Sequence, residues 1–82
     1  MPDRENIRRD VVRVVADIAD LPVEQVTAEA TLQDLGIDSL TGLRIVAEME
    51  KRYKINVPEE AIGGIRSIRD ILRLVDDHTP DS

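Results

Sequence analysis

The side chains best placed to do chemistry are Asp38 and Ser39, in the stretch Leu35-Gly36-Ile37-Asp38-Ser39-Leu40. A helical pattern of apolar residues begins directly after Asp38, whose carboxylate can accept hydrogen bonds from the free N–H groups of the first turn. Ser39 is therefore expected at the mouth of a helix, where those N–H groups and the helix dipole favour an anion. A phosphodiester on the Ser39 hydroxyl would be well placed there. Gly36 gives the loop the freedom to turn sharply into this cap.

Four helical segments are expected to position this loop in an all-α fold, a small four-helix bundle. Residues 4–19 carry apolar side chains at helical spacing, at Ile7, Val11, Val14, Val15 and Ile18. The second helix covers residues 39–53. The third is short, covers residues 58–62, is opened by Pro58 and ends at paired glycines. Ser67 begins the fourth with Asp70 in a capping-box arrangement, and its core face is formed by Ile68, Ile71, Leu72 and Val75.

A long loop, residues 20–37, separates the first two helices. Leu21-Pro22 ends the first helix, because proline restricts the preceding residue and has no N–H to donate. Loops of this length in a small domain are usually functional or partly ordered. We expect one helical turn over residues 31–34, and apolar anchors at Val26, Leu32, Leu35 and Ile37. A crossing of this length also allows the first two helices to run in similar directions.

The second helix carries two apolar stripes. Its core face is formed by Gly42, Ile45, Val46, Met49 and Tyr53, and a glycine on that face predicts close approach of another backbone. A second, narrower stripe lies nearer the side of Ser39 and consists of Leu40, Leu43 and Ala47. This second stripe is either a patch for a partner or additional core packed under the long loop.

Composition limits the classes of function. The 82 residues are enough for one domain, residues 1–82, with its core at about 4–76 and a polar tail at 77–82. The net charge of −6 argues against nucleic acid as a partner and favours a monomer. There is no cysteine, no signal-peptide pattern and no run long enough to cross a membrane, so we expect a cytoplasmic protein. The start at Met1 and the polar tail favour a free-standing chain.

Catalysis by this chain alone is not expected. It has no cysteine, its one histidine, His78, falls in the tail, and it contains no glycine-rich phosphate loop or metal-ligand cluster. Ser39 has no histidine near it in sequence to act as a base, and an unassisted serine hydroxyl is a poor nucleophile.

From about Ile7 to Val75, the order of these segments and the motif around Ser39 resemble the acyl carrier proteins. The resemblance implies that a phosphopantetheinyl transferase moves 4′-phosphopantetheine from coenzyme A onto Ser39, with Asp38 and Leu40 as flanking recognition residues. The thiol of that group would carry acyl intermediates as thioesters to acyl transferases and synthase enzymes. The docking face implied for those partners consists of Leu43, Arg44, Ala47 and Glu48.

The resemblance also implies that an acyl chain shelters between the second, third and fourth helices. The candidate lining residues are Met49, Ile62, Ile65 and Ile71.

The charge of the second helix departs from the usual pattern of this family. Between Ser39 and Lys54, four basic residues oppose two acidic ones, a net charge of +2 in a chain of −6. Typical carriers of fatty-acid synthesis are acidic here, and Thr41 and Arg44 stand where acidic residues are common. Because charge selects partners, a specialised polyketide or fatty-acid-like pathway is favoured.

Two alternatives remain open at this point. The first is a peptidyl or aminoacyl carrier protein. Such carriers commonly have a second glycine where this chain has Ile37. The other is a helical interaction module that binds a partner through Leu40, Leu43 and Ala47 and carries nothing.

Overall fold

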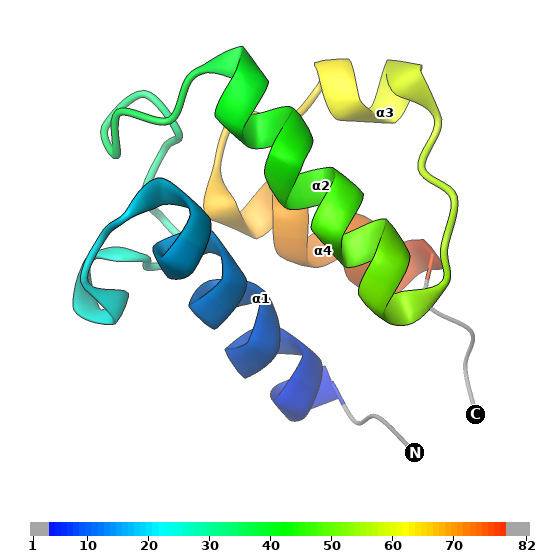
Figure 1. Ribbon diagram of the computed structural model, residues 1–82, viewed down its shortest axis with the longest axis horizontal. Helices are drawn as coiled ribbons and strands as arrows, with labels where there is room; N and C mark the ends of the chain where they lie inside the picture. Colours follow the sequence, from blue (N-terminus) through cyan, green and yellow to red (C-terminus); the bar gives the residue numbers. More distant parts are fainter. Residues whose placement is uncertain (1–3, 79–82) are drawn as a thin grey trace.

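The computed structural model describes residues 4–78 and has four α-helices in that part of the chain (Figure 1). They are α1 (Arg4–Ala19), α2 (Ser39–Tyr53), α3 (Glu59–Gly63) and α4 (Ile68–His78). A short 3-10 helix, η1 (Val23–Gln25), follows α1 and was not expected from the sequence. The predicted all-α architecture is confirmed.

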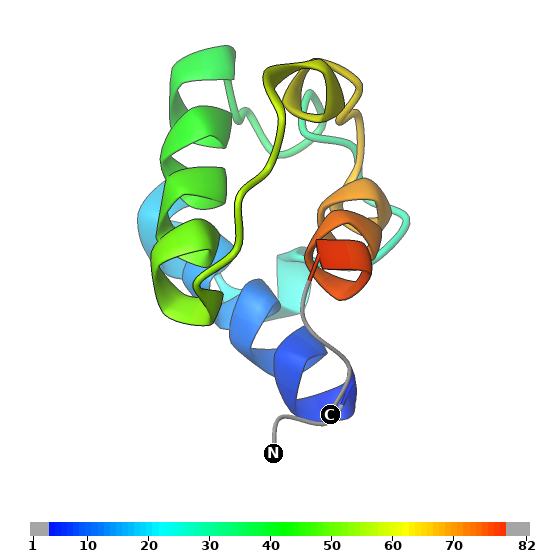
Figure 2. The same cartoon turned by 90° about the vertical axis from the view of Figure 1, so that its right-hand side faces the viewer.

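Helices α1, α2 and α4 surround the core (Figures 1 and 2). All three contribute side chains that are almost completely excluded from solvent: Val11 and Val15 from α1, Ile45 and Met49 from α2, and Ile68, Ile71 and Val75 from α4. The side chains that fill this space are mainly valine and isoleucine, and the one aromatic residue of the chain, Tyr53, is only partly buried beside them. The helical spacing read from the sequence therefore identifies most of the buried residues, but on α4 the predicted Leu72 is only partly buried and Leu74, which was not predicted, is buried.

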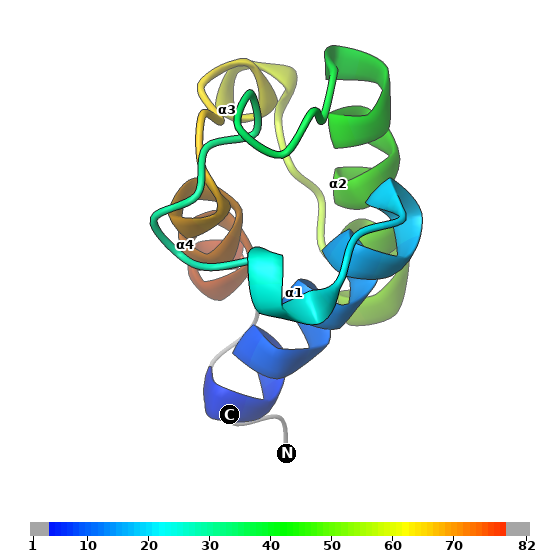
Figure 3. The ribbon, with the colours of Figure 1, turned by 90° about the vertical axis from the view of Figure 1, so that its left-hand side faces the viewer.

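The predicted relative direction of the first two helices is wrong, since α1 and α2 run antiparallel (Figures 1 and 3). Asp10, in the middle of α1, meets the last turn of α2 at Arg52 and Tyr53. The long loop does not lead directly into a second helix that runs parallel to α1. It runs past the beginning of α4 and then climbs to the end of the bundle where α2 begins (Figure 3).

Backbone hydrogen bonds attach the long loop to the start of α4. The N–H groups of Ile68 and Arg69 donate to the carbonyl groups of Ala30 and Ala28, at 3.0 and 3.1 Å. Nearby, the Leu32 N–H donates to the Arg66 carbonyl at 3.0 Å. These bonds satisfy N–H groups that the first turn of a helix otherwise leaves free. The helical turn expected at residues 31–34 is present as a single turn, in which the Leu35 N–H donates to the Thr31 carbonyl at 3.2 Å, beside an isolated bridge between Thr31 and Ser67.

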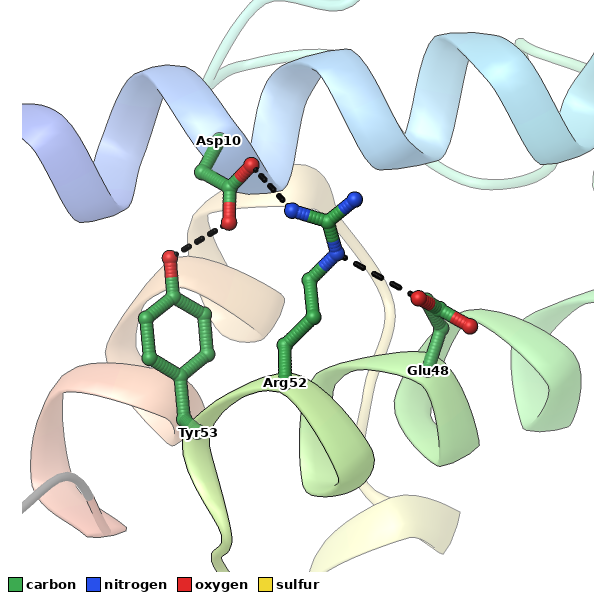
Figure 4. A network of polar contacts seen from close by, with 4 residues as sticks. All are labelled: Asp10, Glu48, Arg52 and Tyr53. Atoms are coloured by element: carbon green, nitrogen blue, oxygen red, sulfur yellow. Dashed lines mark hydrogen bonds and ion pairs between the residues drawn. The ribbon is translucent and has the colours of Figure 1, made fainter.

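A polar network joins α1 to the last turn of α2 (Figure 4). The Tyr53 hydroxyl donates to Asp10 at 2.6 Å, and the Arg52 guanidinium contacts the other oxygen of Asp10 at 2.8 Å. Arg52 also contacts Glu48 at 3.3 Å, one helical turn earlier. Half-exposed ion pairs contribute little stability by themselves. The shared carboxylate, however, fixes the register of two antiparallel helices at one point.

The link between α2 and α3 is extended, as expected, and is held in place by two buried side chains and one hydrogen bond. Its side chains Ile55 and Val57 are buried with Val46 and Leu74 in a second apolar cluster. The Val57 N–H donates to the Glu50 carboxylate at 2.9 Å. By contrast, α3 itself has no buried residue.

The ends of the last two helices differ slightly from the prediction. Pro58 precedes α3 as its N-cap rather than opening its first turn, so the helix is shifted by one residue. Helix α4 reaches His78 and thus includes the first two residues of the expected polar tail. Residues 79–82 of that tail lie outside the described part of the chain. The predicted capping box is present, since the Asp70 carboxylate accepts from the N–H groups of Arg66 and Ser67 at 2.9 and 3.2 Å.

The network at Asp10 predicts an unusual titration of Tyr53. Burial first, and then the hydrogen bond to Asp10, raise the pKa of Tyr53 well above its ordinary value. Unfolding exposes the phenol and returns its pKa to about 10. The free energy of unfolding should therefore fall as the pH rises above about 10, because the unfolded state ionises first. Tyr53 is the sole tyrosine and there is no tryptophan, so absorbance reports this ionisation directly.

Asp10→Asn should lower the pKa of Tyr53 only part of the way, because the burial remains. The network would be contradicted if phenolate absorbance appeared near pH 10 in the parent protein while its helical circular dichroism was still intact.

The capping box predicts a pH-dependent contribution of Asp70 to stability. Asp70→Ala removes both accepted hydrogen bonds and should lower the free energy of unfolding by about 1 kcal/mol in urea at neutral pH. The N–H groups of Arg66 and Ser67 hold the pKa of Asp70 below its usual value. The contribution is therefore complete above the ordinary carboxyl pKa and is lost as the pH falls through the folded-state pKa.

The difference in the free energy of unfolding between Asp70→Ala and the parent should accordingly shrink in strong acid. Asp77→Ala is the matched control, because Asp77 is exposed near the other end of the same helix. An equal loss of stability in both variants would contradict the capping role.

Candidate functional site

The backbone places Ser39 as the first residue of α2. Asp38 is extended and caps the helix, and its carboxylate accepts from the Thr41 N–H at 2.8 Å. Gly36 has a φ of +70°, a conformation that costs glycine little and other residues more. Ile37 follows it and is buried, with its N–H donating to the Leu32 carbonyl at 2.8 Å. One buried side chain and one cap thus fix the position of Ser39, which is itself exposed.

Asp38 remains ionised down to acidic pH. The hydrogen bond from the Thr41 N–H is the main cause that lowers the pKa of this carboxyl. Its negative charge is matched by the N-terminal N–H groups of α2, where a carboxylate is favourable. Asp38 therefore serves as the cap of α2 through its Oδ1 atom.

A half-open cleft of about 510 Å³ lies beside Ser39. Its walls come from the first turns of α2, from α3, from the linker to α4, from α4 and from the long loop. The lining consists of Leu32, Asp38, Ser39, Gly42, Leu43, Glu59, Ile62, Gly63, Ile65, Arg66 and Ile71. Apolar side chains thus line much of a space on whose rim an exposed hydroxyl stands. A volume of this size is within the range of small-molecule sites.

The structure brings three of the four predicted pocket residues to this cleft. Ile62, Ile65 and Ile71 all line it. Met49 does not line the cleft in this structure, because its side chain is completely buried in the core, and its place in an acyl pocket stays a prediction. Met49 lies on the same face of α2 as Gly42, which lines the cleft, but seven residues or about two turns farther along the helix, within the core.

The predicted close approach of another backbone to Gly42 is wrong. A Cβ atom built on Gly42 would meet no heavy atom within 4 Å, so no other backbone approaches it. Gly42 lines the cleft instead.

The second stripe of α2 is exposed, so it is not additional core under the long loop. Leu40 is 70% exposed and Leu43 48% exposed, and Ala47 is exposed as well. Of the other predicted docking residues, Arg44 is exposed, and Glu48 accepts a hydrogen bond from Arg52. Leu43 belongs to both surfaces, because it also lines the cleft.

Glu59 and Arg66 line the cleft and were not predicted as site residues. Each is charged and lies in or next to a short element, so no spacing pattern in the sequence marks it. Gly42 did carry a signal, a glycine inside a helix, but that signal favoured backbone packing.

The geometry favours modification of Ser39 over catalysis by it. The lining of the cleft contains neither histidine nor lysine, and the acid next to Ser39 is engaged as a cap. His78 lies in the last turn of α4, and its Nδ1 is 2.8 Å from the Leu74 carbonyl oxygen. Within residues 4–78, no group of three or more histidine, aspartate or glutamate side chains is arranged to hold a metal ion. No helix in the same part of the chain is both long and apolar enough to span a membrane.

A family model described as "Phosphopantetheine attachment site" matches residues 9–75. An acyl carrier protein of Rickettsia bellii is 31% identical over 75 residues, which cover 90% of this chain and 87% of the relative. An acyl carrier protein of Streptomyces coelicolor is 41% identical over 59 residues, 71% of this chain and 64% of the relative. A 3-methylorcinaldehyde synthase of a Phoma species is 39% identical over 71 residues, 87% of this chain but 3% of that synthase.

Solved structures show the same fold. The acyl carrier protein of Thermotoga maritima superposes with a TM-score of 0.79 at 24% identity, covering 92% of this chain and 88% of that one. The actinorhodin holo acyl carrier protein of Streptomyces coelicolor gives a TM-score of 0.73 at 20% identity, covering 96% and 92%.

The family model spans most of the chain, and the Rickettsia relative matches it along most of both lengths. These matches distinguish a carrier from a helical module that carries nothing. The chain belongs to the acyl carrier protein family, and it is a non-catalytic carrier that tethers acyl intermediates on covalently bound 4′-phosphopantetheine.

Proposed function

We propose that Ser39 is the residue that carries the phosphopantetheine. The observation that supports this most directly is the exposed hydroxyl at the start of α2, on the rim of an apolar cleft. The first turn of a helix provides N–H groups and a positive dipole end for the phosphodiester. The bound group would supply a thiol, which holds the acyl cargo as a thioester.

Asp38 and Leu40 have different roles in this proposal. Asp38 fixes the start of α2 and hence the direction of the Ser39 hydroxyl. Leu40 is 70% exposed next to it and offers an apolar contact to a phosphopantetheinyl transferase. The transferase must reach Ser39 from the solvent side, where nothing in the described part of the chain covers it.

The cleft is the proposed shelter for the acyl cargo. Ile62, Ile65 and Ile71 provide an apolar lining on the side away from Ser39. The side chains of α3 are at most partly buried, with Ala61 and Ile62 packed against the second apolar cluster, so this wall of the cleft can move at a lower cost in buried surface than the core helices.

We infer that the pathway is a specialised one, with a polyketide as the favoured product. Two of the proteins that this chain matches are non-reducing polyketide synthases, of Emericella nidulans and Talaromyces marneffei, and the matches cover 3% and 2% of their lengths. The basic second helix supports partners other than those of ordinary fatty-acid synthesis. We further propose a cytoplasmic monomer, which the net charge of −6 and the cysteine-free composition support.

The attachment proposal predicts one covalent addition at Ser39. After incubation with coenzyme A and a broad-specificity phosphopantetheinyl transferase, intact mass should rise by one phosphopantetheine in the parent and stay unchanged in Ser39→Ala. Helicity and the urea midpoint of Ser39→Ala should match those of the parent, since Asp38 still caps α2. Ser67→Ala is the matched control, because it removes a serine hydroxyl at the start of α4 and should still be loaded. Loading of Ser39→Ala, or no loading of a folded parent by several transferases, would overturn the proposal.

We propose that the docking face of Leu43, Arg44, Ala47 and Glu48, with the basic residues beside it, selects partners whose surface is acidic. Leu40, Arg44, Ala47 and Lys51 are exposed along one stripe of α2, which Lys54 extends as the C-cap just after the helix. The acidic residues of the helix flank this stripe and are engaged elsewhere, Glu48 by Arg52 and Glu50 by the Val57 N–H. Among residues 4–78, no ion pair is found for the three cations of the stripe. The stripe therefore presents basic charge next to apolar contacts.

Reversal of this charge predicts a gain of activity with the wrong partner. A malonyl-CoA transacylase whose docking surface is basic should load the holo form of Arg44→Glu/Lys51→Glu with a kcat/KM about tenfold above that of the parent, because a repulsion becomes an attraction. Added salt should raise kcat/KM for the parent and lower it for the variant.

Arg8→Glu/Arg9→Glu is the matched control, since it changes the net charge equally on the exposed side of α1. If this control gains as much as the α2 variant, net charge and not the docking face is responsible. If neither gains, the stripe does not select partners.

A further inference from the structure

Gly42 has no local structural reason to be glycine. It lies in the first turns of α2, and its N–H donates to the Asp38 carbonyl at 2.9 Å in the usual helical pattern. Its φ is not in the left-handed region, and a Cβ atom there would meet no heavy atom within 4 Å. Glycine is among the poorest helix formers. The helix therefore accepts a destabilising residue that neither its backbone nor its packing requires.

The space beside Gly42 is the cleft. Gly42 lines it together with Ser39, three residues earlier, and with Ile62 and Gly63 of α3 across from it. A Cβ atom on Gly63 would likewise meet no heavy atom within 4 Å, so glycines widen the cleft on two of its walls. Any larger side chain at residue 42 would occupy the cleft close to the proposed point of attachment.

We propose that Gly42 determines which cargo the cleft admits, by leaving room next to Ser39 for an apolar acyl group that is branched or bears a ring. An unbranched chain needs little width and can extend between Ile62, Ile65 and Ile71. A broader group needs free space at the entrance, which residue 42 controls. This inference rests on the proposed attachment at Ser39 and assigns the specificity of the same cleft to a residue on its α2 wall.

The first test separates cargo selection from folding. Gly42→Ala should raise the melting temperature by about 4 °C, because alanine favours the helix and meets no clash. A fall in melting temperature would show that the fold needs the glycine and would overturn the inference.

The second test measures the shielding of two cargoes. Octanoyl- and 3-phenylpropanoyl-phosphopantetheine are transferred from their coenzyme A thioesters onto the parent and onto Gly42→Leu, and thioester cleavage by hydroxylamine is followed by intact mass. In Gly42→Leu, the phenylpropanoyl thioester should be cleaved about tenfold faster than in the parent, a discrimination typical of apolar pockets that gain or lose a small group. The octanoyl thioester should change less. Methyl NMR shifts of Ile62, Ile65 and Ile71 should respond to phenylpropanoyl loading in the parent and no longer in the variant.

Arg9→Leu is the matched control, because it places the same apolar side chain at an exposed position of α1, outside both the cleft and the docking face. Unchanged cleavage in this control supports the inference, and equal acceleration overturns it. Equal shielding of phenylpropanoyl in the parent and in Gly42→Leu also overturns it while leaving the attachment proposal intact. Failure of Ser39 to accept either group overturns both.

Discussion

The backbone hydrogen bonds between the long loop and the start of α4 hold the site together. Carbonyl groups of Ala28 and Ala30 accept from the first turn of α4, and the Leu32 N–H donates to Arg66 in the linker that follows α3. The loop side of this contact leads to Ile37, Asp38 and the start of α2. Its other side leads to the far wall of the cleft. A contact among main-chain groups thus sets the distance between Ser39 and the residues opposite it.

Stability is distributed unevenly around this contact. On one side, α1, α2 and α4 share a fully buried aliphatic core, and Asp10 ties α1 to the last turn of α2 (Figure 4). On the other side, α3 is a single short helix without a buried residue. The cleft is bounded by both kinds of structure. Its α2 wall is therefore rigid, and its α3 wall is the part that can yield to cargo.

Local features of the fold could be predicted from the sequence, and relations between distant segments could not. Spacing and caps define α1, α2 and α4 because they involve neighbours within a few residues. The contact of Asp10 with Arg52 spans 42 positions, and the sequence gives no sign of it. The same limit explains the error in the direction of α1 and α2. For the site, Ser39 and its cap are local, whereas the surroundings of Met49 and Gly42 depend on which distant segment packs against each turn of α2.

The anchored link before α3 has a kinetic consequence. Val57 is fixed by its N–H bond to Glu50 and by burial, so motion of α3 begins only after that residue. A carrier must give up its load to each enzyme in turn, and tight retention would slow every transfer. With cargo in the cleft as proposed, a wall that is held firmly at its base and weakly along its length would give that cargo a short residence time without loosening the helix that presents it. Turnover through the carrier would then depend on the exchange rate of one small helix.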